Sequence, residues 1–336
     1  MSAQRSELLI LQSLLDAPSA GDGSAGIVSG TSLANALGMS RVAIWQHLEK
    51  LREQGFTIES LHARGYRLAA RPATLHATLI DAYRHPCPDA PRIHVLDTVD
   101  STNDEASRRL AAGQPAPFAV LARRQEKGRG RFGRVWQSAT DGNLYSSFAF
   151  RPNVEPARMQ TFTLWMGVNI CALVASFCRT APGIKWPNDL LFDGRKAGGM
   201  LTEARMDADR IHDLVFGLGL NLTPPPKGWP PELATVATSL SEHTGRPVDA
   251  NKFAAALVGR VLDAYAKFLD GSYQKTFADL WNGYDLLRGR AITLLEGTRS
   301  LSGTAVGIDD EGSLLVRLAS GHTGRFRAGE VTFFKK

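Results

Sequence analysis

A short segment in the first half of the chain combines two features that suit binding of a phosphate ester. Between Arg123 and Arg134 it carries six basic residues and a single acid, Glu126. Glycines at positions 128, 130 and 133 interleave these cations and allow the backbone to approach a ligand closely. Guanidinium groups bind phosphates through paired, charge-assisted hydrogen bonds. The segment therefore predicts a loop that wraps a phosphate and neutralises its charge.

The three glycines also match G-x-G-x-x-G, so two nucleotide-binding folds are alternatives. A dinucleotide-binding turn must open a helix, whereas here Ser138-Ala-Thr-Asp-Gly-Asn143 leads into a strand-like run, Leu144–Phe150. A protein kinase would need HRD and DFG motifs, and the sequence contains neither, nor does it contain GxxxxGK[ST]. Both alternatives fail on context. A solvated basic loop remains the ordinary explanation beside the ligand-closing one.

Further polar motifs lie on either side of this loop. They are Ser101-Thr-Asn103, Lys185-Trp-Pro-Asn-Asp189, Gly194-Arg-Lys-Ala-Gly-Gly199 and Gly217-Leu-Gly-Leu-Asn221. Predicted strands flank them, at Ile93–Leu96, Phe118–Ala122, Leu144–Phe150 and Leu214–Asn221. Lysines at sheet edges are usually solvated and a Trp-Pro pair often only packs. None of these motifs is diagnostic when taken alone.

The N-terminal residues predict a separate helical module. Leu8, Leu11 and Leu15 recur at helical spacing, Thr31–Leu37 forms a short helix ended by Gly38, and Ser40 caps a helix over Arg41–Gln54. A hairpin over Phe56–Leu61 and Gly65–Leu68 completes a winged helix-turn-helix. The residues expected to contact DNA are Ser40, Arg41, Trp45, Gln46, Lys50 and Arg64. Residues 1–71 hold seven basic and six acidic side chains, so a protein-interaction module is the alternative.

Composition restricts the class of protein. The chain has 336 residues, of which 43% are hydrophobic and 21% charged, with a formal net charge of +6, as in a soluble protein of two or three domains. Its most apolar stretch, Leu164–Cys178, is interrupted by Asn169 and Ser176 and predicts a buried helix with no membrane partner. Cys87, Cys171 and Cys178 lack disulfide or zinc spacing, which together with the absence of a signal-peptide pattern predicts a cytoplasmic protein.

Taken together, the motifs resemble those of one enzyme family. Ser101-Thr-Asn, Gly128-Arg-Gly-Arg-x-Gly-Arg-x-Trp136, Lys185-Trp-Pro-Asn-Asp189, Arg195-Lys-x-x-Gly199 and Gly217-x-Gly-x-Asn221 have the order and approximate spacing found in biotin protein ligases. With the winged helix in front, the whole chain looks like the bifunctional class that is also a biotin operon repressor.

The resemblance implies an α+β multidomain fold in three parts. A winged helix-turn-helix would occupy residues 1–71. A ligase domain, with an α/β fold and mixed sheet related to class II aminoacyl-tRNA synthetases, would occupy 72–285, and an SH3-like β-barrel 286–336. The tail agrees with the last expectation, because it predicts short strands separated by Gly303, Gly307, Gly312, Gly321 and Gly324.

The resemblance also implies a chemistry. Such a ligase uses ATP, with Mg²⁺, to convert the carboxylate of biotin to biotinoyl-5′-adenylate. It then transfers biotin to a lysine of the biotin carboxyl carrier protein of acetyl-CoA carboxylase. Catalysis of this kind depends on positioning and charge neutralisation and needs no enzyme nucleophile. No metal site formed by protein side chains is expected.

The site residues follow by motif. Biotin is expected to contact Ser101, Thr102, Asn103, Gln125, Arg129, Gly130, Arg131, Trp136, Lys196 and Gly199. ATP is expected to contact Arg131, Trp136, Lys185, Asn188, Lys196, Asn221 and Trp229. The catalytic set is Arg129, Arg131, Lys185 and Lys196, with Arg131 in particular retaining the reactive adenylate.

Two segments depart from the family pattern. Phe132 stands where an arginine is frequent, which removes one charge from the loop and leaves Arg129 and Arg131 for the phosphate. The segment Thr223–Pro231 is rich in proline and occupies the place of an adenine-covering loop. Trp229 within it is therefore the expected adenine contact.

The joined modules predict regulation by linkage. If the adenylate orders loops at a dimer surface, it favours a homodimer that holds two half-sites of operator DNA, and carrier protein relieves repression by consuming the adenylate. Two alternatives stay open. One is a ligase whose winged helix no longer binds DNA, and the other is a biotin- or lipoyl-sensing regulator without ligase activity. The complete set of phosphate-facing cations argues against the second.

Overall fold

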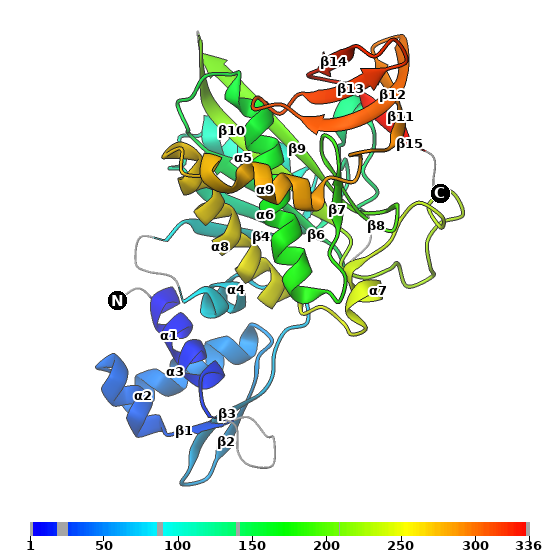
Figure 1. Cartoon of the computed structure of the whole chain (residues 1–336). Helices are drawn as coiled ribbons and strands as arrows, with labels where there is room; N and C mark the ends of the chain where they lie inside the picture. The colour runs from blue at the N-terminus through cyan, green and yellow to red at the C-terminus, as the bar shows by residue number, and fades with distance from the viewer. Residues whose placement is uncertain (1–2, 19–25, 86–89, 139–141, 208, 334–336) are drawn as a thin grey trace. The chain divides into compact units, whose positions relative to one another are not determined.

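The computed structural model describes residues 3–18, 26–85, 90–138, 142–207 and 209–333 (Figure 1). The chain divides into two compact units, Met1–Ala90 with Asp249–Ala255, and Pro91–Val248 with Ala256–Lys336. Cys87 lies outside the described residues. Cys171 is buried and Cys178 is half-buried, both as free thiols.

The first unit contains the predicted helix-turn-helix and hairpin. Its elements are α1 (Ala3–Leu15), β1 (Ile27–Val28), α2 (Gly30–Leu37), α3 (Arg41–Glu53), β2 (Thr57–Leu61), β3 (Gly65–Ala70) and α4 (Ala77–Arg84). The strands form an antiparallel sheet in the order β1-β3-β2. The Ser40 hydroxyl accepts a hydrogen bond from the Ala43 amide and caps α3, while Gly38 ends α2 with a left-handed φ of 63°. Local capping therefore places the turn between the two helices.

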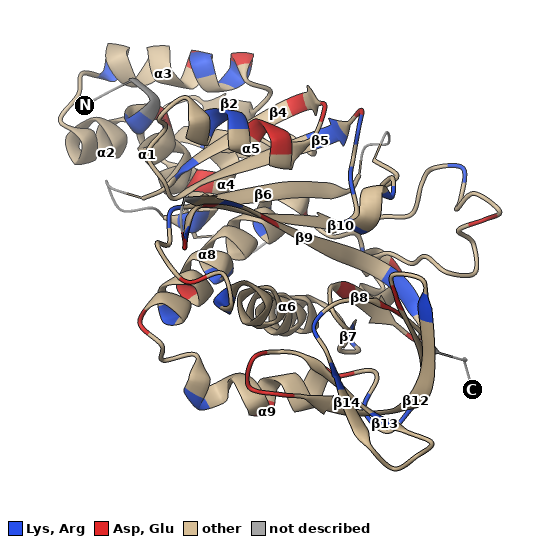
Figure 2. Cartoon of the chain, turned by 90° about the horizontal axis from the view of Figure 1, so that it is seen from above, with Lys and Arg blue, Asp and Glu red and all other residues tan. Residues whose placement is uncertain are grey.

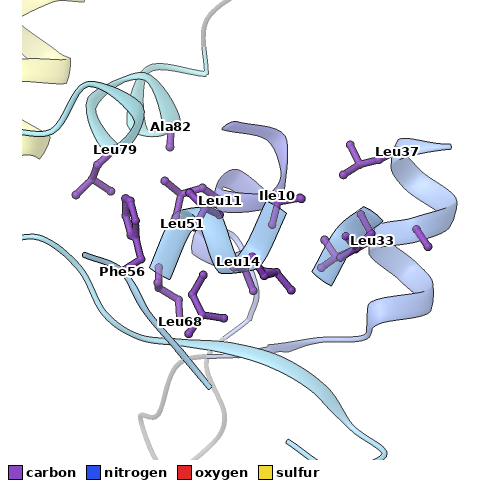
Figure 3. Close-up of a cluster of buried hydrophobic side chains, with 14 residues drawn as sticks. Ile10, Leu11, Leu14, Leu33, Leu37, Leu51, Phe56, Leu68, Leu79 and Ala82 are labelled. Carbon is purple, nitrogen blue, oxygen red and sulfur yellow. The ribbon is translucent and has the colours of Figure 1, made fainter. Parts of the chain in front are cut away.

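A single apolar cluster holds this unit together (Figure 3). Ile44, Leu48 and Leu51 of α3 are fully buried, as the spacing predicts. α1 and α2 contribute Ile10, Leu11, Leu14, Leu33 and Leu37, the hairpin contributes Phe56, Ile58 and Leu68, and α4 contributes Leu79 and Ala82. Because one stripe of α3 is fixed in this core, its opposite stripe is presented to solvent.

The second unit is built on a mixed seven-stranded sheet, which confirms the predicted sheet type. Its order is β4 (Arg92–Val99), β5 (Phe118–Gln125), β6 (Leu144–Phe150), β10 (Arg210–Leu220), β9 (Arg195–Asp207), β8 (Asp189–Phe192) and β7 (Gly183–Lys185). Only β4 and β5 are parallel, and the other neighbours are antiparallel.

Helices cover the two faces of this sheet. α5 (Thr102–Ala111) lies on one face, and α6 (Arg158–Phe177) lies on the other with the part of α8 (Ala250–Leu269) that follows Ala256 (Figure 2). α9 (Gln274–Tyr284) packs on α6, and the short helix α7 (Leu240–Thr244) comes after β10, the last strand of this sheet along the chain. Phe150 stacks on Tyr265 of α8 at 4.0 Å, whereas the neighbouring Ala149 packs with Ala106 of α5. Because successive side chains of a strand point to opposite faces, Phe150 packs in the aromatic core beside α8, whereas Ala149 packs on the face that α5 covers.

α6 begins earlier than the apolar stretch that predicted it. By length and composition its 20 residues could cross a membrane, but 67% of its most apolar window is buried inside the structure. Asn169 is accommodated because its amide donates to the Trp165 carbonyl at 2.9 Å. These observations favour a core helix over a membrane span.

The last segment forms an antiparallel five-stranded sheet in the order β14-β13-β12-β11-β15. Its strands are β11 (Ala291–Glu296), β12 (Arg299–Ile308), β13 (Leu314–Leu318), β14 (Thr323–Phe326) and β15 (Glu330–Phe333). The predicted strand breaks at Gly303, Gly307 and Gly324 are wrong, because these residues lie inside β12 and β14. A Cβ at Gly303 would stand 2.5 Å from the Arg317 carbonyl oxygen, and Gly307 occupies a bulge with φ of 130°. Close backbone approach at Gly303 and a positive φ at Gly307, rather than chain reversal, favour glycine at these two positions.

Candidate active site

Two adjoining cavities in the second unit contain the predicted site residues. The first has a volume of about 290 Å³ and the second about 510 Å³, and both are lined by Trp136, Lys185, Asp189 and Lys196. The first is also lined by the other residues expected for biotin, which are Ser101, Thr102, Asn103, Gln125, Arg129, Gly130, Arg131 and Gly199. Of those expected for ATP alone, Asn221 and Trp229 line the second cavity and Asn188 lines the first. The fold thus brings the separate motifs to one place.

Glycines in the sheet make room for the side chains that wall the first cavity. Gly199 of β9 and Gly219 of β10 are directly paired across the two strands. A Cβ at Gly219 would lie 2.8 Å from Cε2 of Trp136, and one at Gly199 would lie 3.1 Å from its Cζ3. A Cβ at Gly217 would meet Oδ1 of Asn103 at 2.3 Å. The Gly-x-Gly spacing therefore admits an indole and an amide against the same face of the sheet.

A buried polar network forms one end of the first cavity. The backbone amide and hydroxyl of Thr102 donate to Oε1 of Gln125 at 2.8 and 3.0 Å. Oγ of Ser147 lies 2.8 Å from Oγ1 of Thr102 and 2.6 Å from Oδ1 of Asn103. All four side chains are buried. Fixed donors and acceptors of this kind are suited to orienting a small polar ring.

The glycine–arginine loop, residues 125–136, adopts a short hairpin beside this network. The Gly130 amide donates to the Arg134 carbonyl at 2.7 Å, and Arg129 pairs with Val135 across the hairpin. Phe132 stands at the tip with φ of 56° and is 65% exposed. The Arg131 guanidinium lies 4.7 Å from the Phe132 ring centre and donates to Oδ1 of Asn188 at 3.4 Å. Partial desolvation lowers the pKa of Arg131.

Three charged side chains meet at the wall that the two cavities share. Nζ of Lys196 lies 2.6 Å from Oδ1 of Asp189 and 5.1 Å from the ring centre of Trp136. Nζ of Lys185 lies 3.7 Å from Oδ2 of the same carboxylate. Two ammonium groups around one carboxylate leave a net positive charge. An anion that reached from one cavity to the other would be stabilised here.

Several of the other cations between Arg123 and Arg134 form ion pairs. Arg123 pairs with Asp97 at 2.9 Å, Arg134 pairs with Glu330 of β15, and the guanidinium of Arg129 lies between two carboxylates. Three of the six cations between Arg123 and Arg134 are thus paired with acids from other elements, although Arg129 and Arg134 are themselves exposed.

The second cavity lies under residues 223–239. This segment is attached to β9, because the Lys196 amide donates to the Val236 carbonyl at 2.7 Å and the Thr238 amide donates back to Lys196 at 3.0 Å. The Asn221 amide group donates to the Thr238 carbonyl at 3.0 Å. The indole N–H groups of Trp136 and Trp229 are buried, and neither finds a hydrogen-bond partner among the residues that the structure describes.

Within the described ranges, no three His, Cys, Asp or Glu side chains are grouped so that they could hold a metal ion.

The residues predicted for DNA binding lie on the surface of the first unit. Arg41, Trp45, Gln46 and Lys50 are exposed on α3, where Figure 2 shows Lys and Arg residues along the helix. Trp45 is 51% exposed although it is a large aromatic residue. Arg64 is exposed in the turn between β2 and β3, and Ser40 caps α3. A recognition helix and a wing present these groups in a helix-turn-helix protein.

Several residues in or next to the cavity walls were not predicted from sequence. Ser147 lies behind the wall and contacts Thr102 and Asn103, because alternation on β6 places it opposite Gly217, and strand period was the signal that could have found it. Asp104 and Glu203 touch Arg129 from α5 and β9. Val331 and Thr332 of β15 line both cavities. These last residues come from a sheet far along the chain, which no local pattern connects to the site.

Comparison with known proteins agrees with this geometry. Residues 95–221 match the Biotin/lipoate A/B protein ligase family, residues 24–67 match an HTH domain, and residues 288–333 match the Biotin protein ligase C terminal domain. The chain is 31% identical to the bifunctional ligase/repressor BirA of Bacillus subtilis, over 88% of this chain and 90% of that protein. It is 32% identical to the biotin–[acetyl-CoA-carboxylase] ligase of Paracoccus denitrificans, over 71% of this chain and 99% of that protein.

A solved structure supports the same assignment. The biotin protein ligase of Aquifex aeolicus in complex with biotin and ATP matches with a TM-score of 0.61 and 28% identity, over 73% of this chain and 99% of that one. The helix-turn-helix, the central ligase region and the C-terminal region are therefore all accounted for by relatives of one kind. The chain belongs to the family of biotin protein ligases that includes the bifunctional ligase/repressors.

Proposed function

We propose that this chain is an ATP-dependent biotin protein ligase that forms biotinoyl-5′-AMP and transfers biotin to a lysine of a biotin carboxyl carrier domain. The observation that carries the proposal is the pair of adjoining cavities with one shared cationic wall, Lys185, Asp189 and Lys196. Residues expected for biotin line one cavity, and Asn221 and Trp229, expected for the nucleotide, line the other. Two substrates bound side by side would react at the wall between them.

The buried network would orient biotin for this reaction. Its ureido ring binds against Thr102 and Gln125, whose positions are fixed by hydrogen bonds of 2.8 and 3.0 Å. Trp136 forms the apolar side of the cavity, and the valeryl tail passes under the glycine–arginine loop toward Lys196. The fixed ring would place the carboxylate toward Lys196.

Charge neutralisation would then drive the first step. A carboxylate oxygen of biotin attacks the α-phosphorus of ATP, a new P–O bond forms, and the bond to pyrophosphate breaks. Lys196 neutralises the carboxyl oxygens and Lys185 the phosphates, while Asp189 holds both ammonium groups within 3.7 Å of its carboxylate. In the second step the acceptor lysine attacks the acyl carbon and AMP leaves. No enzyme nucleophile takes part.

Mg²⁺ would arrive with the nucleotide. Since the described residues contain no cluster of three candidate ligands, the cavity fits an ion that is held by phosphates and water rather than by a protein cage. Such an ion supplies charge neutralisation at the phosphates.

Arg131 would retain the adenylate. Its side chain is half-buried, lines the first cavity and donates a hydrogen bond to Asn188, and the residue stands beside Phe132 at the tip of the hairpin. A guanidinium at this point would bind the phosphate of the adenylate and so hinder its release from the cavity. The intermediate is thereby kept for the correct lysine.

The proposal divides the chain into three functional parts. Residues 1–71 bind DNA, residues 72–285 carry out ligation, and residues 286–336 form the C-terminal domain. α4 belongs by packing with the first unit, so the packing boundary lies beyond the functional one. A class II synthetase-like central fold is supported by the mixed sheet, and an SH3-like barrel by the five antiparallel strands. We place the protein in the cytoplasm.

Repression of biotin genes is the second function. The exposed face of α3 carries Arg41, Gln46 and Lys50, which suits a helix lying in the major groove of operator DNA. Biotinoyl-AMP acts as corepressor by promoting a homodimer that spans two half-sites. Gel shifts with DNA from upstream of biotin genes test this role. An operator-binding curve that is indifferent to biotin and ATP would overturn the linkage.

The ligase function is tested by transfer of biotin to a purified carrier domain, followed by mass spectrometry. The wild-type chain biotinylates the carrier only with ATP present. Lys196→Gln abolishes transfer, whereas Lys267→Gln, which breaks a Lys–Asp pair of 2.8 Å on the surface of α8, does not. Transfer at the wild-type rate by Lys196→Gln would contradict the assigned wall.

A further inference from the structure

The guanidinium of Arg129 is engaged on two sides by carboxylates. Its Nη1 and Nη2 lie 3.0 Å from Oε1 and Oε2 of Glu203, which is a bidentate arrangement. Its Nη2 also donates to Oδ1 of Asp104 at 2.6 Å. One positive and two negative charges leave this cluster with a net charge of −1. A site of that sign does not attract a phosphate or a carboxylate.

Glu203 is itself held in place by the wall of the first cavity. Its Oε2 accepts a hydrogen bond of 2.6 Å from Nδ2 of Asn103. Asn103 is buried and fits there because Gly217 beneath it has no side chain. Glu203 comes from β9 and Asp104 from the first turn of α5, so both acceptors stand on regular elements. The acceptor site for the guanidinium is thus preorganised.

The position of Arg129 determines that of the loop tip. Arg129 pairs with Val135 across the hairpin, and the Gly130 amide donates to the Arg134 carbonyl at 2.7 Å. Fixing Arg129 therefore fixes the base of the hairpin, two residues before Arg131. The tip then lies where Arg131 reaches Asn188 at 3.4 Å. Backbone hydrogen bonds hold the ends of the loop, with the Lys127 amide donating to the Asp100 carbonyl at 2.8 Å and the Trp136 amide donating to the Gly128 carbonyl at 2.9 Å. Between those ends, the side-chain contacts of Arg129, Arg131 and Arg134 hold the hairpin over the cavity.

We propose that Asp104 and Glu203 form a carboxylate latch that clamps Arg129 and so keeps the glycine–arginine loop closed over the biotin cavity. Asp104 and Glu203 are positioning residues that act through Arg129. Arg129 serves loop closure rather than charge neutralisation at the phosphate, and that task falls to Arg131 with the two lysines. This inference rests on the proposed ligase function.

Retention of the adenylate tests the latch in the full-length protein. Labelled biotinoyl-adenylate is made in the site from biotin and ATP, and its release is followed by rapid filtration. Glu203→Gln keeps the size of the side chain and its bond to Asn103 but removes the charge. Because the pair is half-exposed, release is expected to be about three- to tenfold faster, and Asp104→Asn is expected to give a smaller increase of the same sign.

A double-mutant cycle separates a latch from a general structural effect. Arg129→Ala accelerates release, and Glu203→Gln added to Arg129→Ala produces no further acceleration. Glu59→Gln is the matched control, because Glu59 pairs with Arg67 in the first unit with similar exposure. This control releases adenylate at the wild-type rate.

Each outcome decides a separate point. Equal acceleration by Glu203→Gln with and without Arg129 would overturn the latch, and so would release from Glu203→Gln at the wild-type rate. If the wild-type chain formed no adenylate at all, the ligase function itself would be wrong. The two failures are thereby distinguishable.

Discussion

Replacing Gly219 by alanine perturbs the wall that the two cavities share. A Cβ at this position would lie 2.8 Å from Cε2, 2.9 Å from Nε1 and 3.0 Å from Cζ2 of Trp136. Carbon atoms prefer separations of about 3.5–4.0 Å, so the edge of the indole must retreat by about 0.5–1 Å. The backbone at Gly219 lies outside the left-handed region, and alanine adds no strain of its own. The substitution therefore acts on Trp136.

The magnitude follows from where the indole can go. Overpacking of this kind costs about 1–3 kcal/mol. Trp136 is half-buried and belongs to a loop, so the free protein relieves most of the clash by moving the ring. The displaced ring then occupies space that substrates need. Since Trp136 lines both cavities, we expect the KM for biotin and the KM for ATP each to rise about tenfold, which corresponds to about 1.4 kcal/mol.

Steady-state kinetics on a carrier domain, with thermal unfolding in parallel, measures both quantities. Gly199→Ala is a graded comparison, because its Cβ would meet Trp136 at 3.1 Å and Lys196 at 3.2 Å, and a smaller effect is expected. Gly259→Ala is the control, since nothing lies within 4 Å in α8. It leaves both KM values unchanged and stabilises the helix by about 0.5–1 kcal/mol. If folded Gly219→Ala kept both KM values within about twofold of wild type, the role of Trp136 as shared wall would be refuted.

Three further predictions concern the adenylate, DNA and pH. Arg131→Ala raises adenylate release and the labelling of bystander lysines, and unchanged release would remove the role assigned to Arg131. Lys50→Ala weakens binding to operator and unrelated DNA alike and lowers the salt slope of binding by about 1 in gel shifts across a salt series. Burial lowers the pKa of His76, His94 and His243 from its ordinary value of 6.5, so the stability that the neutral imidazoles allow is fully present above pH 6.5 and is lost as the pH falls from 6.5 through the lowered folded-state pKa. Urea unfolding at pH 7.5 and 5.5 checks this, and His243→Gln reduces the difference between the two.

The sequence was most informative where local chemistry dictates structure. Ser40 and Gly38 delimit α3 and α2 by capping, and the stripe of Ile44, Leu48 and Leu51 is buried as its spacing predicts. The residues expected for biotin all line one cavity because short motifs at strand ends are carried to the same place by the sheet. Their roles in catalysis stay predictions until they are measured.

The remaining features depend on contacts between distant segments. Glu203 and Asp104 reach Arg129 from positions 74 and 25 residues away, and a charged side chain on a strand or helix is usually solvated. Gly303 was expected to end a strand, yet it lies inside one because the Arg317 carbonyl approaches it closely. Only the pairing of strands decides such positions. Single-sequence patterns contain no information on that pairing.

The central claim is that biotin and ATP react with each other in this protein. Exchange of labelled pyrophosphate into ATP tests it most directly, because the assay needs neither the carrier domain nor the operator. We predict exchange that requires biotin, is not supported by lipoate, and is lost in Lys196→Gln while Lys267→Gln retains it. A folded protein that showed no biotin-dependent exchange would contradict the account and leave a ligand-sensing regulator in its place.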